Sequence, residues 1–365
     1  MYRKRELFQG CLLGLAVGDA MGYTVDSKSL QEIRDDYGPN GLLGYDLVNG
    51  YADVTSYTQI AAFSANGLLL GLTRGQIQGK MAPLVRYIGL ALREWSRSQH
   101  YCEQEKNFCW LSNTAELKRR RCMDTWLLSV LSRDTLGTPE EPVSRSDHPS
   151  TLTCVLPVAL MGHRMGLSLE ETVQLGAEAV ALTHGPEGFL PAAALTYALH
   201  RIAYESAPDL KQLVRDTIDA IQFQFGRQYG QTTHLWELLQ LAQTLADTPE
   251  IPGCDAMERL GCRTAGEVLA GVLYACATCH NDFDAAMITA VNHSGRSAAV
   301  GAVTGALLGA HMGASALPEF YLESLEPTAL LMELSDDLLQ GCPMDRLSNL
   351  FDDDWDRKYL HAGKA

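Results

Sequence analysis

YADVTSYTQIAAFSANGLLLGL, residues Tyr51–Leu72, places a polar segment directly before a long apolar one. The second half is hydrophobic on almost every side of a helix, so we expect a helix in the centre of the protein. Ser56 followed by Gln59 fits a capping box, in which each side chain satisfies a free backbone N–H. Asp53 and Thr55 add oxygens beside the same helix start. The segment is therefore either an ordinary N-cap or the mouth of a ligand or metal site.

Two other stretches carry glycine at every fourth position. They read GCLLGLAVGDAMG over Gly10–Gly22 and GAVTGALLGAHMG over Gly301–Gly313. A glycine inside a helix costs about 1 kcal/mol relative to alanine, so a row of four needs a compensating use. Small residues at this spacing let two helix backbones approach closely. We expect the two helices to pack on one another, with the groups at their ends sharing a site.

The rest of the chain predicts helices joined by loops, without the alternation typical of strands. No linker is long enough to separate domains, so we expect one all-α domain over residues 1–365. Gly137–Ser150 is predicted to be a loop, and the acidic tail around Asp352–Asp356 to be solvated. Helices are expected at residues 81–95, 123–131, 151–162, 169–183, 189–204, 210–225, 234–245, 265–277 and 283–291, with short ones in 322–339.

Composition limits the classes of partner. The chain has 365 residues, 46% of them hydrophobic, and a net charge of −15. An acidic protein lacks the positive field that attracts phosphates, which argues against nucleic acid and anionic membranes as partners. Ten scattered cysteines do not resemble a disulfide framework, and Glu6 interrupts the signal-like N-terminus, so we expect a cytoplasmic protein. Ala298–Leu317 is uncharged but rich in Gly and Ala, which favours a packed helix over a membrane span.

Several segments, in order and spacing, resemble the ADP-ribosylglycohydrolase family, which includes the dinitrogenase-reductase-activating glycohydrolases. The resemblance covers about residues 6–340. It implies a single large orthogonal bundle of helices and a Mg²⁺-dependent hydrolase that removes ADP-ribose from proteins or related conjugates. The matching segments are GCLLGLAVGDAMGY, Asp53–Gln59, LTHG at Leu182–Gly185, AVNHSGRSAAVGAVTGALLGA and GASALPEFYLESLE.

The chain departs from the family at the residues that hold the metals. The family reads Thr-Asp-Asp-Thr where this chain has Thr55-Ser56-Tyr57-Thr58, and Gly-Asp-x-Asp-Ser/Thr where it has Gly295–Ala299. Of the ligands in the first motif, only Thr55 remains. The glycine-rich substrate loop is replaced by SDHPSTLTCVLP, at Ser146–Pro157. An acidic residue of the family falls near Asp26.

These changes predict that the protein holds no Mg²⁺ and no other cofactor. Mg²⁺ needs octahedral oxygen ligation with carboxylates, and Arg296 stands where a ligand is expected. Arg296 either pairs with Asp53 or Asp26 inside the vacated site or faces an anionic ligand. Tyr57 either fills the cavity or stacks on a ligand ring. Other residues expected to line the pocket, or only to support it, are Thr55, Ser56, His184, His293, Ser294 and Ser297.

Three functions follow from these expectations. The first is an inactive family member that binds ADP-ribose, another anionic small molecule or a protein. The second is a metal-independent N- or O-glycoside hydrolase of altered specificity that uses the carboxyls of Asp26 and Asp53. The third is structural reuse of the fold with a filled pocket.

Overall fold

The computed structural model describes residues 2–47, 50–100, 107–117, 119–121, 124–206, 208–230, 233–345 and 350–362. These residues form helices and no β-strand, as the sequence predicts. The helices are α1 Tyr2–Val25, α2 Leu30–Tyr37, α3 Ser56–Gln78, α4 Leu84–Ser98, η1 Trp110–Asn113, α5 Thr125–Leu131, η2 Pro149–Val155, α6 Leu156–Met161, α7 Leu169–Ala181, α8 Pro186–Tyr204, α9 Leu210–Tyr229, α10 Leu235–Ala246, α11 Gly253–Leu260, α12 Ala265–Thr278, α13 Phe283–Val291, α14 Ser297–Met312, η3 Ala314–Ala316, α15 Glu319–Glu323, α16 Thr328–Gln340 and α17 Asp353–Tyr359.

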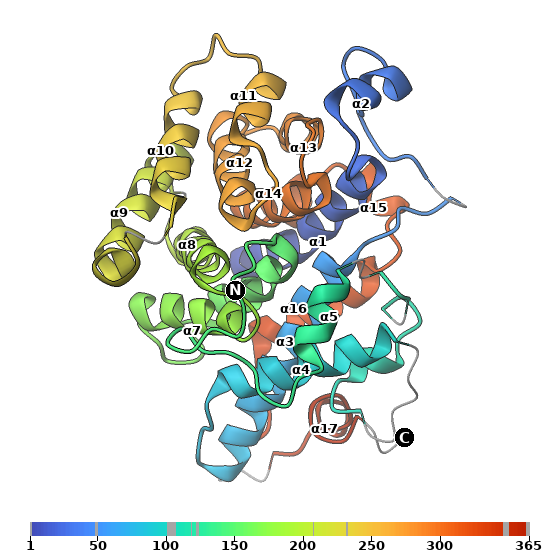
Figure 1. The fold of residues 1–365 in the computed structure, drawn as a ribbon. Helices are drawn as coiled ribbons and strands as arrows, with labels where there is room; N and C mark the ends of the chain where they lie inside the picture. Colours follow the sequence, from blue (N-terminus) through green and yellow to red (C-terminus); the bar gives the residue numbers. More distant parts are fainter. Residues whose placement is uncertain are drawn as a thin grey trace.

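The two glycine-rich helices, α1 and α14, form the centre of the fold and run antiparallel (Figure 1). A Cβ atom built on Gly14 would lie 2.1 Å from the carbonyl oxygen of Gly305, and one on Gly18 would lie 1.8 Å from that of Gly301. Only glycine permits such close backbone approach. The predicted contact between the two glycine rows is therefore confirmed, and it explains why both helices tolerate residues of poor helix propensity.

Helix α3 lies beside this pair, with α16 packed against both α1 and α3. Its residues Tyr57–Leu70 are almost all buried, which confirms the predicted central helix. Figure 1 shows α7 to α10 on one side of the central helices and α4, α5 and α17 on the other. The start of α3 and the start of α14 both lie near the C-terminal half of α1, so the chain brings three distant segments to one place.

Several elements differ from the expected ones. Helices α2 and α11 were not expected, because each is short and strongly charged. The expected helix at 151–162 is a 3-10 turn, η2, that continues into α6. The acidic tail is not simply solvated, because it forms α17 and buries Trp355 and Tyr359. The aromatic residues inside this acidic segment provide the apolar face that docks it.

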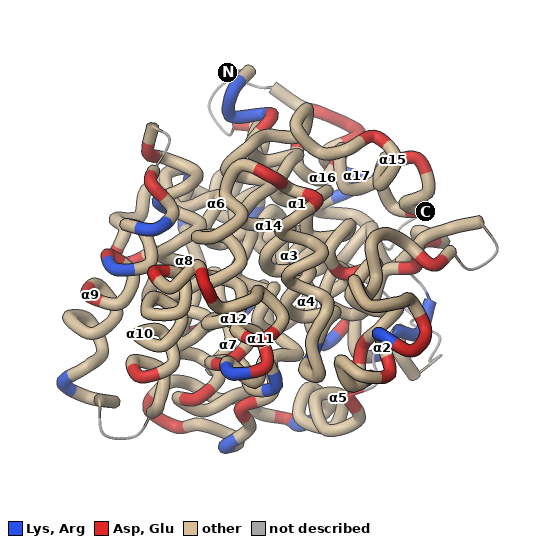
Figure 2. The backbone as a smooth tube through the Cα atoms, turned by 90° about the horizontal axis from the view of Figure 1, so that it is seen from above, with Lys and Arg blue, Asp and Glu red and all other residues tan. Residues whose placement is uncertain are grey.

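Charged residues lie mostly on the peripheral helices, the loops and the first turn of α1, while the buried parts of the central helices carry few of them (Figure 2). Among the described residues, no helix is both long enough and apolar enough to span a bilayer. The segment Ala298–Leu317 is mostly the buried helix α14, whose alanines and glycines pack against other helices.

Candidate functional site

Asp19 of α1 joins the first helix to the start of α3. Its side chain is fully buried and accepts four hydrogen bonds. The backbone N–H groups of Thr55 and Thr58 donate to Oδ2 at 2.9 and 3.0 Å, and the two hydroxyls donate at 2.6 Å each. Burial raises the pKa of Asp19 to about 6, and the four hydrogen bonds oppose that rise. A carboxyl at a helix N-terminus also complements the helix dipole. Asp19 thus occupies the place where an external anion would otherwise bind.

Helix α3 begins at Ser56, and Thr55 is its N-cap. The Thr55 hydroxyl accepts from the N–H two residues on, at 3.3 Å. The predicted capping box of Ser56 and Gln59 is therefore wrong. The Gln59 side chain points into the core, where it accepts from the indole of Trp95 at 3.0 Å and donates to the carbonyl of Arg119 at 2.8 Å. A buried tryptophan N–H competes successfully for this amide oxygen.

Asp53 and Asp26, the two predicted catalytic carboxyls, have different partners. Asp53 forms ion pairs with Arg119 at 3.2 Å and with Arg121 at 2.8 Å. Asp26 accepts a hydrogen bond at 3.1 Å from the N–H of Ala298, in the first turn of α14. Burial raises the pKa of Asp26, while this hydrogen bond and the positive charge of Arg296 lower it. Each carboxyl is already engaged, one by arginines and the other by a helix start.

Arg296 immediately precedes α14 and is half-buried. Its charge acts on Asp26, but its guanidinium forms no hydrogen bond or ion pair with a described residue. The expected pairing with Asp53 is not seen, because Arg119 and Arg121 take that carboxylate. The guanidinium of Arg296, which is always charged and carries its donors in a rigid fork, therefore remains available for an anion.

Tyr57 lies in the first turn of α3 and is 8% exposed. Burial raises the pKa of its hydroxyl well above the usual value, Asp26 raises it further and Arg296 opposes the rise. Its backbone carbonyl accepts from the hydroxyl of Thr153 in η2, at 2.7 Å. The ring is therefore buried at the start of α3, where the charges of Asp26 and Arg296 act on its hydroxyl.

His184 is fully buried at the turn between α7 and α8. Its Nδ1 faces the hydroxyls of Thr183 at 2.7 Å and Thr151 at 3.1 Å, and its ring meets the edge of Trp126. Its Nε2 is buried without a hydrogen-bond partner among the described residues. Burial, assisted by His148, lowers the pKa of His184 to about 4, so the ring is neutral near pH 7.

The segment before η2 brings a second histidine near Arg296. His148 is the N-cap of η2, and its Nδ1 lies 3.4 Å from a carboxylate oxygen of Asp124. Burial lowers the pKa of His148, while Asp124 raises it. Two residues on, the hydroxyl of Ser150 is buried without a hydrogen-bond partner in the described part of the chain. Tyr57, His148, His184 and Arg296, called the mouth below, thus lie close enough for their charges to act on one another. The cluster combines a guanidinium with two imidazoles, and the Nε2 atom of His184 has no hydrogen-bond partner among the described residues.

Three predicted residues near α14 have partners that stabilise the local turn. His293 is fully buried; its Nε2 pairs with the carbonyl of Ala290 and its Nδ1 accepts from the N–H of Gly295, each at 2.9 Å. The Ser294 hydroxyl accepts from the first N–H of α2 at 2.9 Å. The Ser297 hydroxyl donates to the carbonyl of Val291 at 2.8 Å. These contacts hold the loop that positions Arg296.

Sequence reasoning missed Asp19, Asp124, His148 and Ser150. Asp19 could have been found from the sequence, because it is the single charged residue between Gly10 and Gly22 and needs buried donors. Asp124 and His148 are N-cap residues at the ends of loops, and Ser150 lies in a short 3-10 helix; no periodicity indicates which side chains of such segments converge.

With this geometry established, the comparisons with known proteins give one consistent result. The family model described as ADP-ribosylglycohydrolase matches residues 2–347. The chain belongs to the ADP-ribosylglycohydrolase family. An uncharacterized protein of Archaeoglobus fulgidus is 23% identical over 340 residues, which is 92% of this chain and 96% of that protein. A solved structure titled ADP-ribosylglycohydrolase-related protein complex shares the fold, with a TM-score of 0.52, 21% identity and coverage of 93% of this chain and 99% of that one.

The Mg²⁺ that the ADP-ribosylglycohydrolase family implies does not fit the residues at this mouth. The buried carboxylate, Asp19, already accepts four hydrogen bonds, and the Thr55 hydroxyl donates to it. Asp53 is neutralised by two arginines, and Arg296 adds a further positive charge. Within the described residues, no group of three or more His, Cys, Asp or Glu side chains is arranged to hold a metal ion. A divalent cation needs uncommitted oxygens, and these side chains do not supply them.

Proposed function

We propose that this member of the ADP-ribosylglycohydrolase family performs no Mg²⁺-dependent hydrolysis and binds an anionic small molecule of the ADP-ribose type. The observation that carries the proposal is the engagement of Asp19, Asp26 and Asp53 by hydrogen bonds or arginines, beside a guanidinium that has no hydrogen-bond or ion-pair partner among the described residues. None of these three carboxyls is free to act as a base.

The remaining polar groups suit an anion better than a cation. Arg296 presents paired donors that match a phosphate or diphosphate. His148 lies near it and is half-buried. His184 and Ser150 each keep a buried polar atom without a partner among the described residues, which costs free energy until a ligand or water reaches it. A diphosphate with attached riboses offers acceptors for all of these donors.

Calorimetry with ADP-ribose tests the proposal. We expect binding by the wild type, and about tenfold weaker binding by Arg296→Gln, since hydrogen bonds to charged groups contribute at least about 1.5 kcal/mol. Arg263→Gln is the matched control, because Arg263 is exposed and only its backbone forms a hydrogen bond. An equal loss in both variants, or hydrolysis of an ADP-ribosylated protein that depends on Mg²⁺, contradicts the proposal.

The burial of Tyr57 favours a second candidate, in which the fold is kept and the pocket is filled. In that case the wild type gives no heat with ADP-ribose, and Tyr57→Ala gains binding because the ring no longer occupies the mouth. If the ring instead stacks on the ligand, Tyr57→Ala weakens binding. The metal-independent glycoside hydrolase is the least supported candidate, because both of its carboxyls already have partners.

A further inference from the structure

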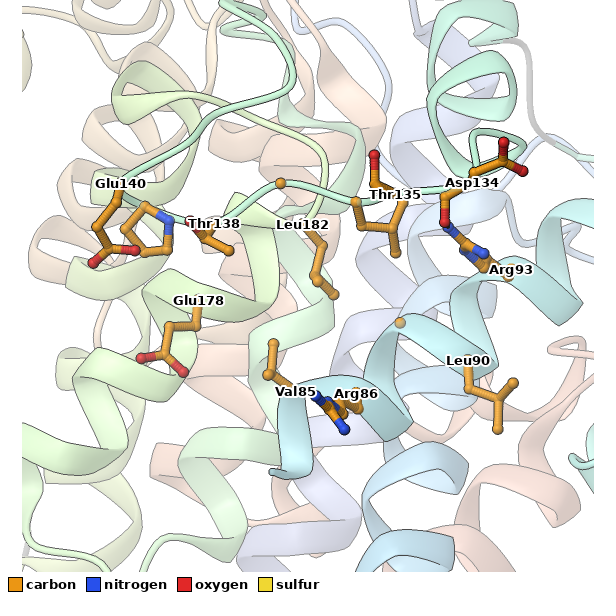
Figure 3. A pocket seen from close by; sticks show the side chains of 14 residues that line it. Val85, Arg86, Leu90, Arg93, Asp134, Thr135, Thr138, Glu140, Glu178 and Leu182 are labelled. Atoms are coloured by element: carbon orange, nitrogen blue, oxygen red, sulfur yellow. The ribbon is translucent and has the colours of Figure 1, made fainter. Parts of the chain in front are cut away.

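A cavity of about 750 Å³ opens between α4, the segment 134–140 and α7 (Figure 3). None of the residues that form the mouth lines it. Its apolar wall is made by Val85, Leu90, Leu136 and Leu182, with Gly89 between them. This volume falls in the range that accommodates a small organic molecule or a short peptide.

Hydrogen bonds hold the rim of this cavity in place. The N–H of Gly137 donates to the carbonyl of Leu182 at 2.9 Å, and Arg93 Nη2 donates to the carbonyl of Asp134 at 2.9 Å. A Cβ on Gly137 would lie 2.5 Å from the carbonyl of Ala181, so glycine is required for the segment to approach α7. The cavity is therefore formed before any ligand arrives, which lowers the entropy lost on binding.

The charged side chains of the cavity are distributed unevenly. Figure 3 shows Glu140 and Glu178 on one side and Arg86 and Arg93 toward the other, where Asp134 lies beside Arg93. Arg86 is exposed, and its guanidinium forms no hydrogen bond or ion pair with a described residue. Glu178 is half-buried, and among the described residues its carboxylate accepts only from the Gln174 amide, at 3.2 Å. A ligand with a positive end, an apolar body and a negative end matches this order.

A second hollow, of about 640 Å³, continues on the far side of Glu178. Glu178 lines both hollows, and α4 and α7 contribute to both. The second hollow is lined by Met81, Leu84 and Met165, with Glu170 at its edge. The two together form a trough that follows the α4–α7 contact, and a trough fits a linear chain better than a compact molecule.

We propose that the first hollow of this trough binds a short linear peptide with apolar side chains, whose carboxylate reaches Arg86 and whose amino end lies over Glu178, where the second hollow begins. The leucine-lined wall between the charges buries the apolar side chains, and that burial supplies the affinity. The two charged ends fix the direction of the chain, because the reversed peptide would place like charges together. This site is independent of the mouth.

Calorimetry with trileucine, with its C-terminal amide and with N-acetyltrileucine tests the proposal. We expect amidation to weaken binding to the wild type about tenfold, since a charge-assisted hydrogen bond is lost. In Arg86→Ala, free and amidated peptide should bind equally. Acetylation of the amino end should likewise weaken binding to the wild type about tenfold. In Glu178→Gln, acetylated and free peptide should bind equally.

Arg97→Ala is the control, because Arg97 lies on the same helix, is exposed and does not line the trough. It should keep the wild-type response to amidation. Thermal unfolding of each variant establishes that it is folded. The proposal is overturned if trileucine does not bind to the folded wild type at millimolar concentration, or if amidation weakens binding to wild type and Arg86→Ala by the same factor.

Discussion

The middle and the end of the α1–α14 pair obey different constraints. In the middle, carbonyl oxygens lie where side chains would be, and Gly14 against Gly305 leaves no room for a single methyl group. At the end, Asp26 and Arg296 lie beside the first turn of α14 with polar and charged neighbours. Close packing of the glycine backbones therefore holds the two helices together, whereas the polar groups at the helix ends are not needed for that packing.

The largest effect should come from disrupting the glycine contact in the middle of the α1–α14 pair. Gly14→Ala should lower the free energy of unfolding by about 3 kcal/mol, because its methyl group would meet a backbone carbonyl that has nowhere to move. Urea denaturation followed by circular dichroism measures the change. Gly44→Ala is the control, since a Cβ there has no atom within 4 Å. Equal stabilities of the two variants would refute the close contact.

The pH dependence of stability tests the loop that leads into α14. Burial lowers the pKa of His293 to about 4, below its usual 6.5. Between pH 6.5 and 4 the unfolded chain binds a proton that the folded protein excludes, so stability is present above this window and is lost as the pH falls through it. At pH 4.5 this term removes about 2.5 kcal/mol.

His293→Gln isolates this contribution. The free energy of unfolding of the wild type should fall more between pH 7 and pH 4.5 than that of the variant, by about 2.5 kcal/mol. Denaturation at the two pH values measures the difference. Parallel curves for wild type and variant would mean that His293 is not buried as a neutral ring.

A smaller loss of stability is expected at Asp19, which joins α1 to the start of α3. Asp19→Asn should cost about 2 kcal/mol, because the amide cannot accept all four of the hydrogen bonds that the carboxyl accepts. Asp219→Asn is the control, since Asp219 is exposed on α9 and its side chain has no hydrogen-bond or ion-pair partner among the described residues. Chemical denaturation near pH 7.5 keeps Asp19 ionised. A loss below about 0.5 kcal/mol would show that Asp19 does not anchor α3.

The sequence predicts the middle of the molecule better than its end. Glycine at every fourth residue from Gly10 to Gly22 is a periodic signal with one good physical use, and the predicted contact is confirmed. The all-α class follows from the same kind of periodicity. The residues of the mouth follow no periodic pattern in the sequence. That Asp53 faces Arg119 and Arg121 depends on a loop more than sixty residues away, which no local pattern reveals.

The helix start illustrates why local rules fail at such a place. Ser56 and Gln59 satisfy the spacing of a capping box, yet Thr55 caps α3 and Gln59 binds the buried indole of Trp95. The buried partners of Gln59 take the place of the local contact that the capping box requires. The acidic tail is a second example, because Trp355 and Tyr359 dock a segment whose charge predicts a solvated chain.

Under the proposed function, the mouth binds an ADP-ribose-type anion without Mg²⁺. The most direct measurement is the affinity for ADP-ribose as Mg²⁺ is raised from zero, in a chelator, to several millimolar at constant ionic strength. We predict the same dissociation constant throughout, because Arg296 supplies the positive charge and the carboxylates are engaged. An affinity that rises with Mg²⁺, or ADP-ribose binding that appears only when Mg²⁺ is present, would contradict the claim.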